Sequence, residues 1–548
     1  MTINGSEDRF PRNWRILSIL QVMLVSISVV MGAALNQLLL LLILLVGAAS
    51  SVRALADWPQ AAGPNHDYRV QGRGPTYFSA TLDTCIKWRT SLPNTGESTP
   101  IVSGDRIFLT SHQTIRADAE SGCEIYGLCF DASTGKELWR RELPATRVTD
   151  MASGFSDNTA ASPVADGKYV CFVNVGGSIQ TFDYAGNLIW QKTWVPFGRH
   201  HARQQEPILH NGNVIFLRTV AEGLSTEATT KEGAKHLGRG EEVWTRLHAY
   251  NLATGEVEWI AESASSVHSL SMLRKKNNGS SLILTGRGGG HQPPEEPYGL
   301  SLISGDNGKT IWDSAIAGYN AHQNAVFSDS FAEAFIGLEH HTFDLESGLS
   351  RQVLDLVENA TYRLYEPNRD QYISVDSIDK STNKRSRPIT YHTNCLIDKY
   401  HYFRAHENHL IGRVDLARRK VEYLQVPVQV DRRETKEKLH WDRAIANDGR
   451  NRDGFIAYQD KRATLDGWGH VSAASPIVVG DYLYMPTMVG TIYVLRWNAD
   501  QFTEESIVSI SDLGPPGSTW SLSSLSYDKG RLYARTMKEL ICISDEVR

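Results

Sequence analysis

The chain has 548 residues, 41% of them apolar and 22% charged, a balance that excludes a disordered or collagen-like protein. Its 56 basic and 62 acidic residues give a net charge of −6 and form no long block of either sign. This argues against a protein held on nucleic acid by phosphate neutralisation, so no nucleic-acid partner is expected. Six cysteines without a Cys-x-x-Cys pair provide neither a disulfide scaffold nor a zinc-ribbon motif.

Residues 16–52 carry no charged side chain and follow Arg9, Arg12 and Arg15. As a helix this segment would run ~55 Å, more than one ~30 Å bilayer core requires. Three interpretations stay open: a long leader cleaved after Ala56, an uncleaved membrane anchor, or a true start at Met31 that opens an ordinary leader. We favour cleavage after Ala54-Leu55-Ala56, because small residues at this spacing suit a signal peptidase. Residues 1–56 are therefore predicted to be a signal peptide or anchor, and the remainder to be exported to the periplasm or cell envelope.

A glycine that precedes a tryptophan by four residues recurs along the rest of the chain. The copies are Gly135–Trp139, Gly186–Trp190, Gly255–Trp259 and Gly308–Trp312, with a weaker copy at Gly348 and one ending at Lys420 that has lost the glycine. Glycine supplies the positive φ of a tight turn, and a constant offset places each tryptophan on the same face of the following strand. The pattern predicts repeated hairpins.

A second pattern consists of an anchor residue, a short apolar strand, a polar turn and an aromatic-rich strand. Clear copies begin at Pro100, Pro163, Pro207 and Pro476, and degenerate copies begin near Ser271, Ala325, Cys395 and Ser524. Together the two patterns give eight units of four short antiparallel strands. This repeat predicts an all-β fold, an eight-bladed β-propeller occupying residues 57–548 as a single domain.

The two ends of this domain carry complementary parts of one unit. Residues 540–544 form a third-type strand without a fourth strand after it, whereas residues 85–88 have the fourth-type form without a preceding turn. We expect these segments to pair, which closes the ring and removes an exposed sheet edge. A monomer is expected.

These residues resemble the PQQ-like, or quinoprotein-like, β-propeller superfamily. Residues 129–139 and 249–259 follow its tryptophan motif, Ala-x-Asp-x-x-Thr-Gly-Lys-x-x-Trp, and residues 58–65 look like the opening of exported bacterial propellers of this type. The resemblance implies that tryptophan rings dock blade against blade, and it assigns this role to Trp88, Trp139, Trp190, Trp259 and Trp312. Their role is structural.

Two functional branches of the superfamily differ from this chain at residues that matter. The quinone-dependent alcohol dehydrogenases carry a vicinal cysteine pair and a calcium ligand set, whereas this chain has no adjacent cysteines and no recognisable calcium ligands. PQQ with Ca²⁺ is therefore not expected, and no cofactor or metal is predicted. The outer-membrane-assembly branch consists of lipoproteins, and here the first cysteine after the leader is Cys85.

Strand direction points to one rim of the ring as the working face. Antiparallel order places the first-to-second and third-to-fourth turns on one rim and the other connections on the opposite rim. The long insertions all belong to the second class, at 111–125, 219–245, 286–299, 354–391 and 427–472. Variable loops on a rigid scaffold are where binding and catalysis usually reside.

Polar and aromatic residues predicted to face the funnel on this rim form the candidate binding site. Histidines precede three consecutive anchors, a pattern that suits hydrogen bonding to water or backbone as well as a polar ligand site, while a metal site is not predicted. The glycine-rich 285–298 loop and the 459–470 loop add charged and aromatic groups. The full set is Glu97, Gln204, His268, Arg287, His291, His322, His392, Trp468, His470 and Trp520.

The sequence favours an exported binding or assembly platform that holds a protein partner or a small polar ligand on the funnel rim. The first alternative is an enzyme acting on a carbohydrate-like polar substrate, with funnel histidines and carboxylates as general acid and base. The second is a PQQ-dependent dehydrogenase. Contact with a membrane is expected only through residues 16–52.

Overall fold

Short apolar strands joined by tight turns make up the computed structural model. It describes residues 57–115, 117–118, 124–146, 157–194, 206–221, 243–266, 270–287, 298–317, 319, 324–358, 360–376, 390–405, 409–457 and 474–546. Within these residues no helix is long and apolar enough to cross a membrane. A single turn of 3-10 helix, η4, occupies Glu504–Ser506.

The first four blades follow the predicted repeat strand by strand. Blade 1 contains β3 (Ile101–Ser103), β4 (Arg106–His112), β5 (Ile125–Asp131) and β6 (Glu137–Leu143); blade 2 contains β7 (Val164–Ala165), β8 (Tyr169–Asn174), β9 (Ser178–Asp183) and β10 (Leu188–Thr193). Blade 3 contains β11 (Ile208–His210), β12 (Asn213–Ala221), β13 (Val243–Asn251) and β14 (Val257–Ile260); blade 4 contains β15 (Met272–Lys275), β16 (Ser281–Arg287), β17 (Gly299–Ser304) and β18 (Thr310–Ala315). Each is a four-stranded antiparallel sheet.

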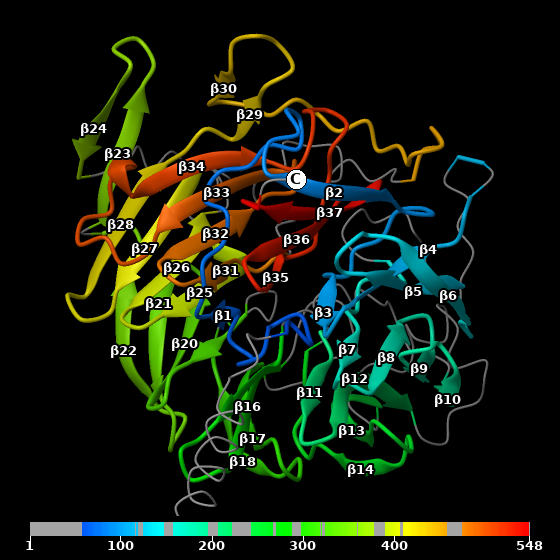
Figure 1. Cartoon of the computed structure of the whole chain (residues 1–548). Helices are drawn as coiled ribbons and strands as arrows, with labels where there is room; N and C mark the ends of the chain where they lie inside the picture. Colours follow the sequence, from blue (N-terminus) through cyan, green and yellow to red (C-terminus); the bar gives the residue numbers. More distant parts are fainter. Residues whose placement is uncertain are drawn as a thin grey trace, which may run out of the picture. The chain divides into compact units, whose positions relative to one another are not determined.

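The remaining four blades keep this order and gain strands from elsewhere in the chain. Blade 5 contains β19 (Val326–Phe327), β20 (Phe331–Ile336), β21 (Glu339–Asp344) and β22 (Ser350–Asp355); blade 6 contains β25 (Thr390–Ile397), β26 (Tyr400–Ala405), β27 (Leu410–Asp415) and β28 (Lys420–Gln425), extended by β23 (Ala360–Glu366) and β24 (Gln371–Val375). Blade 7 contains β31 (Ile477–Val479), β32 (Tyr482–Pro486), β33 (Thr491–Arg496) and β34 (Ile507–Asp512), with β1 (Arg69–Val70) added; blade 8 contains β35 (Ser526–Asp528), β36 (Arg531–Arg535), β37 (Glu539–Ser544) and β2 (Ile86–Ser91). The predicted eight-bladed all-β propeller is confirmed, and Figure 1 shows its sheets following one another around a ring.

Pairing between the two ends of the domain closes the ring as predicted. The early strand β2 runs antiparallel to β37 near the carboxyl terminus, with Trp88 opposite Cys542 and Ser91 opposite Glu539. Backbone hydrogen bonds continue beyond the strands, from Leu92 N to Lys538 O (2.9 Å). The inner strand β3 of blade 1 then contacts both β7 of blade 2 and β35 of blade 8. Blade 8 exists only because these distant segments meet.

A tryptophan from one blade lies against the glycine turn of the next blade. The indole of Trp139 donates from Nε1 to Tyr184 O (3.0 Å), and a Cβ on Gly186 would lie 3.0 Å from the same ring. The indoles of Trp88, Trp190 and Trp312 donate in the same way, to Ala132 O, Leu252 O and Leu345 O. The turn requires its glycine for two reasons: the residue adopts positive φ, and it must leave room for the indole ring.

Blade 6 breaks this pattern at the place where the sequence has lost its glycine. Arg419 takes the left-handed position with φ of 55°. In blade 1 a bulge brings Trp139 opposite Cys129, but blade 6 has a regular register in which Glu422 lies opposite Arg413. The position of the docking indole is therefore occupied by a carboxylate.

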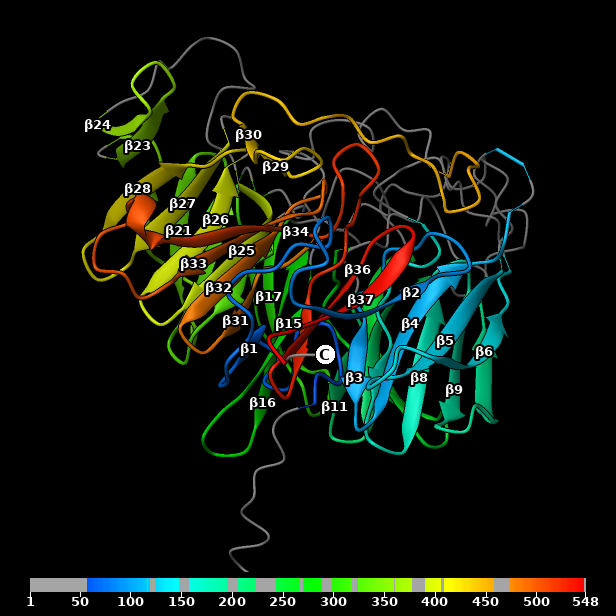
Figure 2. The same ribbon diagram turned by 45° about the horizontal axis from the view of Figure 1, so that its top comes forward.

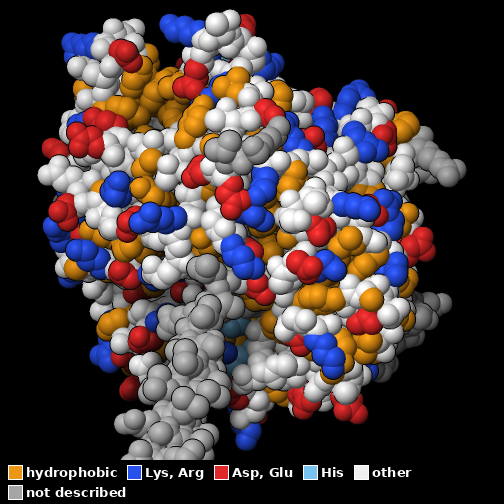
Figure 3. All heavy atoms as spheres, viewed as in Figure 1, with side chains coloured by type: hydrophobic (Ala, Val, Ile, Leu, Met, Phe, Trp, Pro, Cys, Tyr) orange, Lys and Arg blue, Asp and Glu red, His pale blue; other side chains and the backbone are white. Residues whose placement is uncertain are grey.

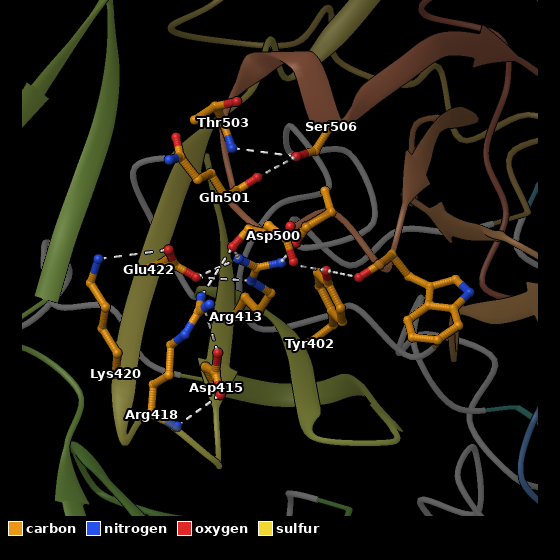
Figure 4. Close-up of polar contacts among 12 residues, drawn as sticks. Tyr402, Arg413, Asp415, Arg418, Lys420, Glu422, Asp500, Gln501, Thr503 and Ser506 are labelled. Carbon is orange, nitrogen blue, oxygen red and sulfur yellow. Dashed lines mark hydrogen bonds and ion pairs between the residues drawn. The ribbon is translucent and has the colours of Figure 1, made fainter.

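A buried charged network replaces the indole between blades 6 and 7 (Figure 4). Arg413 is fully buried, pairs with Glu422 at 2.6 Å, and donates to the backbone carbonyls of Ala499 and Asp500. The hydroxyl of Tyr402 donates to Trp497 O at 2.6 Å. A buried arginine is tolerated because its donors find a carboxylate and carbonyl oxygens, which compensates for the cost of desolvation.

The long insertions at 354–391 and 427–472, expected as loops, contain hairpins. In the first, β23 pairs in parallel with β28, and Tyr362 stacks on Tyr423 with ring centroids 4.8 Å apart. In the second, β29 (Gln429–Asp431) pairs with β30 (Lys438–His440). Figure 2 shows both hairpins projecting at the same end of the ring. The strands of these hairpins were not predicted because their sequences do not follow the repeat of the blades.

A chain of buried polar side chains crosses the contact between blades 5 and 6. Thr342 donates to Glu333 (2.7 Å), whose carboxylate lies 3.8 Å from His340, and His340 shares a 2.9 Å hydrogen bond with His401. In a bond between two imidazoles one ring must accept, so both cannot be charged. Burial lowers the pKa of His340 to about 3 and raises the pKa of Glu333 to about 8, which keeps this interface neutral.

Replacement of Trp139 by alanine is expected to destabilise the fold by ~3–5 kcal/mol, because it leaves a cavity between two blades and removes an indole hydrogen bond. Urea unfolding monitored by circular dichroism measures this change. The neighbouring substitution Leu138→Ala serves as the control, since Leu138 is 41% exposed. Equal effects of the two substitutions would contradict interblade docking by Trp139.

The substitution Glu333→Gln is expected to reduce the loss of stability as pH rises. The pKa of Glu333 is higher in the folded protein than in the unfolded chain, so the folded state binds the proton more tightly. Its contribution is complete below the unfolded pKa of about 4.5 and is lost as pH approaches about 8. Glutamine should lessen the stability difference between pH 5 and pH 8 by about 1–4 kcal/mol. Urea midpoints across this range test it, and a profile identical to that of the exposed control Glu346→Gln would refute it.

Candidate functional site

The antiparallel order of each blade divides the ring into two rims. The first-to-second turns, such as those at Gly104 and Gly212, are short and lie on what we call the turn rim. The second-to-third and fourth-to-first connections lie on the opposite side, which we call the insertion rim. Both added hairpins, β23–β24 and β29–β30, belong to fourth-to-first connections. The insertion rim is therefore the variable face that the sequence indicates.

Many of the predicted funnel residues lie outside the part of the chain that the structure describes. They are Gln204, His268, His291, His322, Trp468 and His470. The backbone of His392 belongs to β25, but its side chain is not described. The structure accordingly locates Glu97, Arg287 and Trp520 from the candidate set.

Glu97 lies in a buried polar cluster where blades 1 and 2 begin. Its backbone N–H donates to Thr159 Oγ1 (2.9 Å), and the Thr159 hydroxyl donates to Asp157. Asp157 pairs with His112 at 3.0 Å, with both side chains at most 2% exposed. Burial alone would raise the pKa of Asp157, yet His112 and Thr159 hold it below its ordinary value. This cluster fixes the two inner strands at the insertion rim.

Arg287 and Trp520 make contacts within the ring. Arg287 pairs with Asp313 of the same blade at 3.2 Å, and Ser263 donates to that carboxylate. Trp520 is 1% exposed and packs in an apolar cluster with Ala457, Met488, Leu522 and Met537. Both side chains therefore support the rim from below its surface.

Aromatic side chains join the tip of the first added hairpin to the second hairpin. Tyr365 of β23 stacks on Trp441, which follows β30, with centroids 3.8 Å apart and planes inclined by 8°. Tyr372 meets the same indole edge-on at 6.0 Å. An ion pair between Arg363 and Glu504 ties the first hairpin to blade 7. Sequence reasoning missed this cluster because Tyr365 and Trp441 are far apart in the chain.

The surface around these hairpins mixes apolar and charged groups. Figure 3 shows hydrophobic side chains gathered in the recess between the two hairpins, while acidic and basic side chains are interspersed over the remainder of that face. No large area of one sign interrupts this face. Such a surface suits contact with another protein better than it suits binding of a polyanion.

A second feature, which sequence reasoning did not foresee, lies inside the ring. The segment 57–70 passes along the inner strands: Trp58 exchanges backbone hydrogen bonds with Val102, Pro59 O accepts from Ala165 N (2.9 Å), and β1 pairs with β31. It covers the inner edges of blades 1, 2 and 7. The sequence signal for this segment is weak: residues 65–69 mix polar and apolar side chains and follow Gly63 and Pro64.

A cavity of about 150 Å³ remains between this segment and the inner strands of blades 4, 5 and 6. Ser328 and Asp398, both in first-to-second turns, are among its lining residues, so it lies toward the turn rim. Burial raises the pKa of Asp67 in its wall to about 6, although Arg69 opposes the shift. Burial also lowers the pKa of His66 to about 3, with Lys275 adding to the effect, and His66 instead shares a 2.8 Å hydrogen bond with Gln60.

The described residues give the following picture of metal ligands and cysteines. Among them, no group of three or more histidine, cysteine, aspartate or glutamate side chains is arranged to hold a metal ion. Cys85, Cys129, Cys171, Cys395 and Cys542 are free thiols. Burial raises the pKa of Cys129 to about 12, so this thiol is unreactive at neutral pH.

Comparison with known proteins identifies the fold. Residues 127–275, from β5 to β15, match the family model PQQ_2, described as outer membrane protein assembly factor BamB. No curated protein sequence gives a significant match. Among solved structures, quinohemoprotein alcohol dehydrogenase ADHIIG from Pseudomonas putida HK5 has a TM-score of 0.50 at 9% identity, covering 90% of this chain and 81% of its own.

Two further solved structures are similar at lower scores. The quinohemoprotein alcohol dehydrogenase from Comamonas testosteroni has a TM-score of 0.49 at 12% identity, covering 90% of this chain and 81% of its own. BamB from Moraxella catarrhalis has a TM-score of 0.34 at 12% identity, covering 70% of this chain and 96% of its own. Identities this low bear on the fold alone. The described part of residues 57–548 therefore forms an eight-bladed β-propeller, and residues 127–275 within it match the PQQ_2 family model.

Proposed function

We propose that the chain is an exported, monomeric binding platform that holds a protein partner on its insertion rim. The observation that carries this proposal is the raised surface formed by β23–β24 and β29–β30. Both hairpins are additions to a regular repeat, both project on one rim, and the Tyr365–Trp441 stack holds them together. A rigid scaffold with elaboration on a single rim is the usual arrangement of a recognition surface.

The geometry of the first hairpin suits contact with another polypeptide. In the described part of the chain, β24 is the last strand of its six-stranded sheet, so one row of its backbone groups faces away from β23. An edge of this kind can accept an added strand from a partner. The tip at 367–371 is exposed, while Tyr372 and Trp441 are half-buried beside it. The exposed polar turn and the half-buried aromatic side chains beside it together resemble the rim and core of a protein interface.

Export and an assembly role are supported by separate observations. The uncharged segment 16–52 ends near the Ala54-Leu55-Ala56 sequence, which suits cleavage during secretion. The family model that matches residues 127–275 is described as an outer membrane assembly factor. We place the platform in the periplasm or cell envelope on these grounds.

A photo-crosslinking amino acid at Arg369 or Leu439 is expected to capture one and the same protein in cells that produce the chain. Both positions are exposed on the two hairpins. The matched control is Lys168, exposed in a first-to-second turn of blade 2 on the turn rim, which should capture no such adduct. Mass spectrometry of the adducts identifies the partner.

The variant Tyr365→Ala distinguishes a specific interface from a sticky surface. It should abolish the adduct at Arg369 because the two hairpins lose their stack. The thermal midpoint should change little because Tyr365 lies in an added strand, outside the four repeat strands of blade 6. Adducts of equal yield from Lys168, or retention of the Arg369 adduct in this variant, would refute a partner site on the insertion rim.

A further inference from the structure

The cavity at the centre of the ring has no role in the partner site on the insertion rim. It lies between the 65–69 segment and the inner strands β15, β19 and β25. Leu270, Met272 and Phe327 supply apolar surface, and Asp67, Arg69 and Arg274 supply charged hydrogen-bonding groups. At about 150 Å³ it can enclose one molecule of modest size, well below the volume of a drug-sized site.

The charges around this cavity are mostly compensated. Arg69 pairs with Asp398 at 3.1 Å, and Arg274 pairs with Asp329 at 2.7 Å. Asp67 accepts a hydrogen bond from the backbone N–H of Arg69 through Oδ1 (3.0 Å), and no ion pair among the described residues includes Asp67. The cations are Arg69 and Arg274, and the carboxylates are Asp67, Asp329 and Asp398. Together they leave little net charge to attract an ionic ligand. A dianion would lack an unpaired cation, and a metal ion would lack a converging set of ligands.

The backbone of the wall adopts a costly conformation. His66 and Tyr68 have φ of 62° and 60°, in the left-handed region that residues other than glycine rarely enter. Hydrogen bonds from Tyr68 N to Ala62 O and from Val478 N to Tyr68 O, both 2.8 Å, hold this conformation. Retained strain of this kind is concentrated at ligand sites.

The lining combines groups that match a hydroxylated ring. A sugar hydroxyl both donates and accepts, so it can donate to the Asp67 carboxylate while it accepts from the guanidinium of Arg69 or Arg274. The apolar C–H face of the same molecule would lie against Phe327 and Met272. We infer that the central cavity binds a small neutral polyhydroxyl molecule, a monosaccharide or a polyol of similar size.

Saturation-transfer NMR on the leaderless chain, residues 57–548, tests this site with named probes. D-glucose, D-galactose, D-mannose and myo-inositol are each added, with inorganic phosphate and L-alanine as ionic comparators. At least one of the four polyhydroxyl probes should bind in the millimolar range or tighter, and neither ionic probe should compete for the site. Binding of phosphate or alanine in place of all four would overturn the inference, as would no binding by any probe.

Two variants place the binding in the cavity. Asp67→Asn should weaken the bound sugar at least tenfold, because an amide is a poorer acceptor than a carboxylate. Val326→Phe should abolish binding by filling the space, with circular dichroism confirming that the ring is folded. The control Asp166→Asn changes an exposed carboxylate in a turn of blade 2 and should leave affinity unchanged. Affinity unaltered by both cavity substitutions would overturn the assignment. The outcome is independent of the partner experiment on the insertion rim.

Discussion

The contact between the fourth strand of one blade and the third-to-fourth turn of the next is the interaction on which the structure depends. Each blade is a small sheet whose two faces are both apolar, so neither face is stable in water until a neighbour covers it. Indoles such as Trp139 cover part of that face, donate to a backbone carbonyl, and fit only because Gly186 lacks a side chain. The ring must then close, or one blade would keep an open face and an open edge.

The indole contact is one solution among several in this chain. Between blades 6 and 7, the Tyr402 hydroxyl donates to the carbonyl of Trp497, the residue that follows β33, and the buried Arg413 of the Arg413–Glu422 pair donates to Ala499 O beyond it. A charged pair holds its geometry only when every donor is satisfied, which the carbonyls of Ala499 and Asp500 achieve. The ring therefore tolerates loss of the motif in its degenerate half, and the adjoining hairpins β23–β24 and β29–β30 occupy that half as well.

The repeat, the blade count and the closing strand could be predicted because local patterns determine them: glycine and tryptophan at a fixed offset, proline before an inner strand, and matching incomplete units at the two ends. The hairpin β23–β24 could not be predicted, since its parallel pairing with β28 depends on residues 61 positions away, such as Ala360 and Val421. The extent of burial could not be predicted either, and Trp520 packs in an apolar cluster with Ala457. The central cavity depends on where the 57–70 segment enters the ring, which no local pattern specifies. The two proposed sites differ accordingly: the raised insertion rim is proposed to hold a protein, and the small cavity is proposed to hold a neutral polar molecule.

Disulfide trapping across β2 and β37 tests the closed ring most directly. In the double variant Ser91→Cys and Glu539→Cys, the two new cysteines replace cross-strand partners. Mild oxidation of the folded monomer should therefore link them within one chain in nearly every molecule, as shown by peptide mapping. The pair Ser91→Cys and Arg369→Cys should remain unlinked. Failure of the first pair to form an intramolecular bond, or its appearance only between chains, would contradict the ring and with it the assignment of both rims.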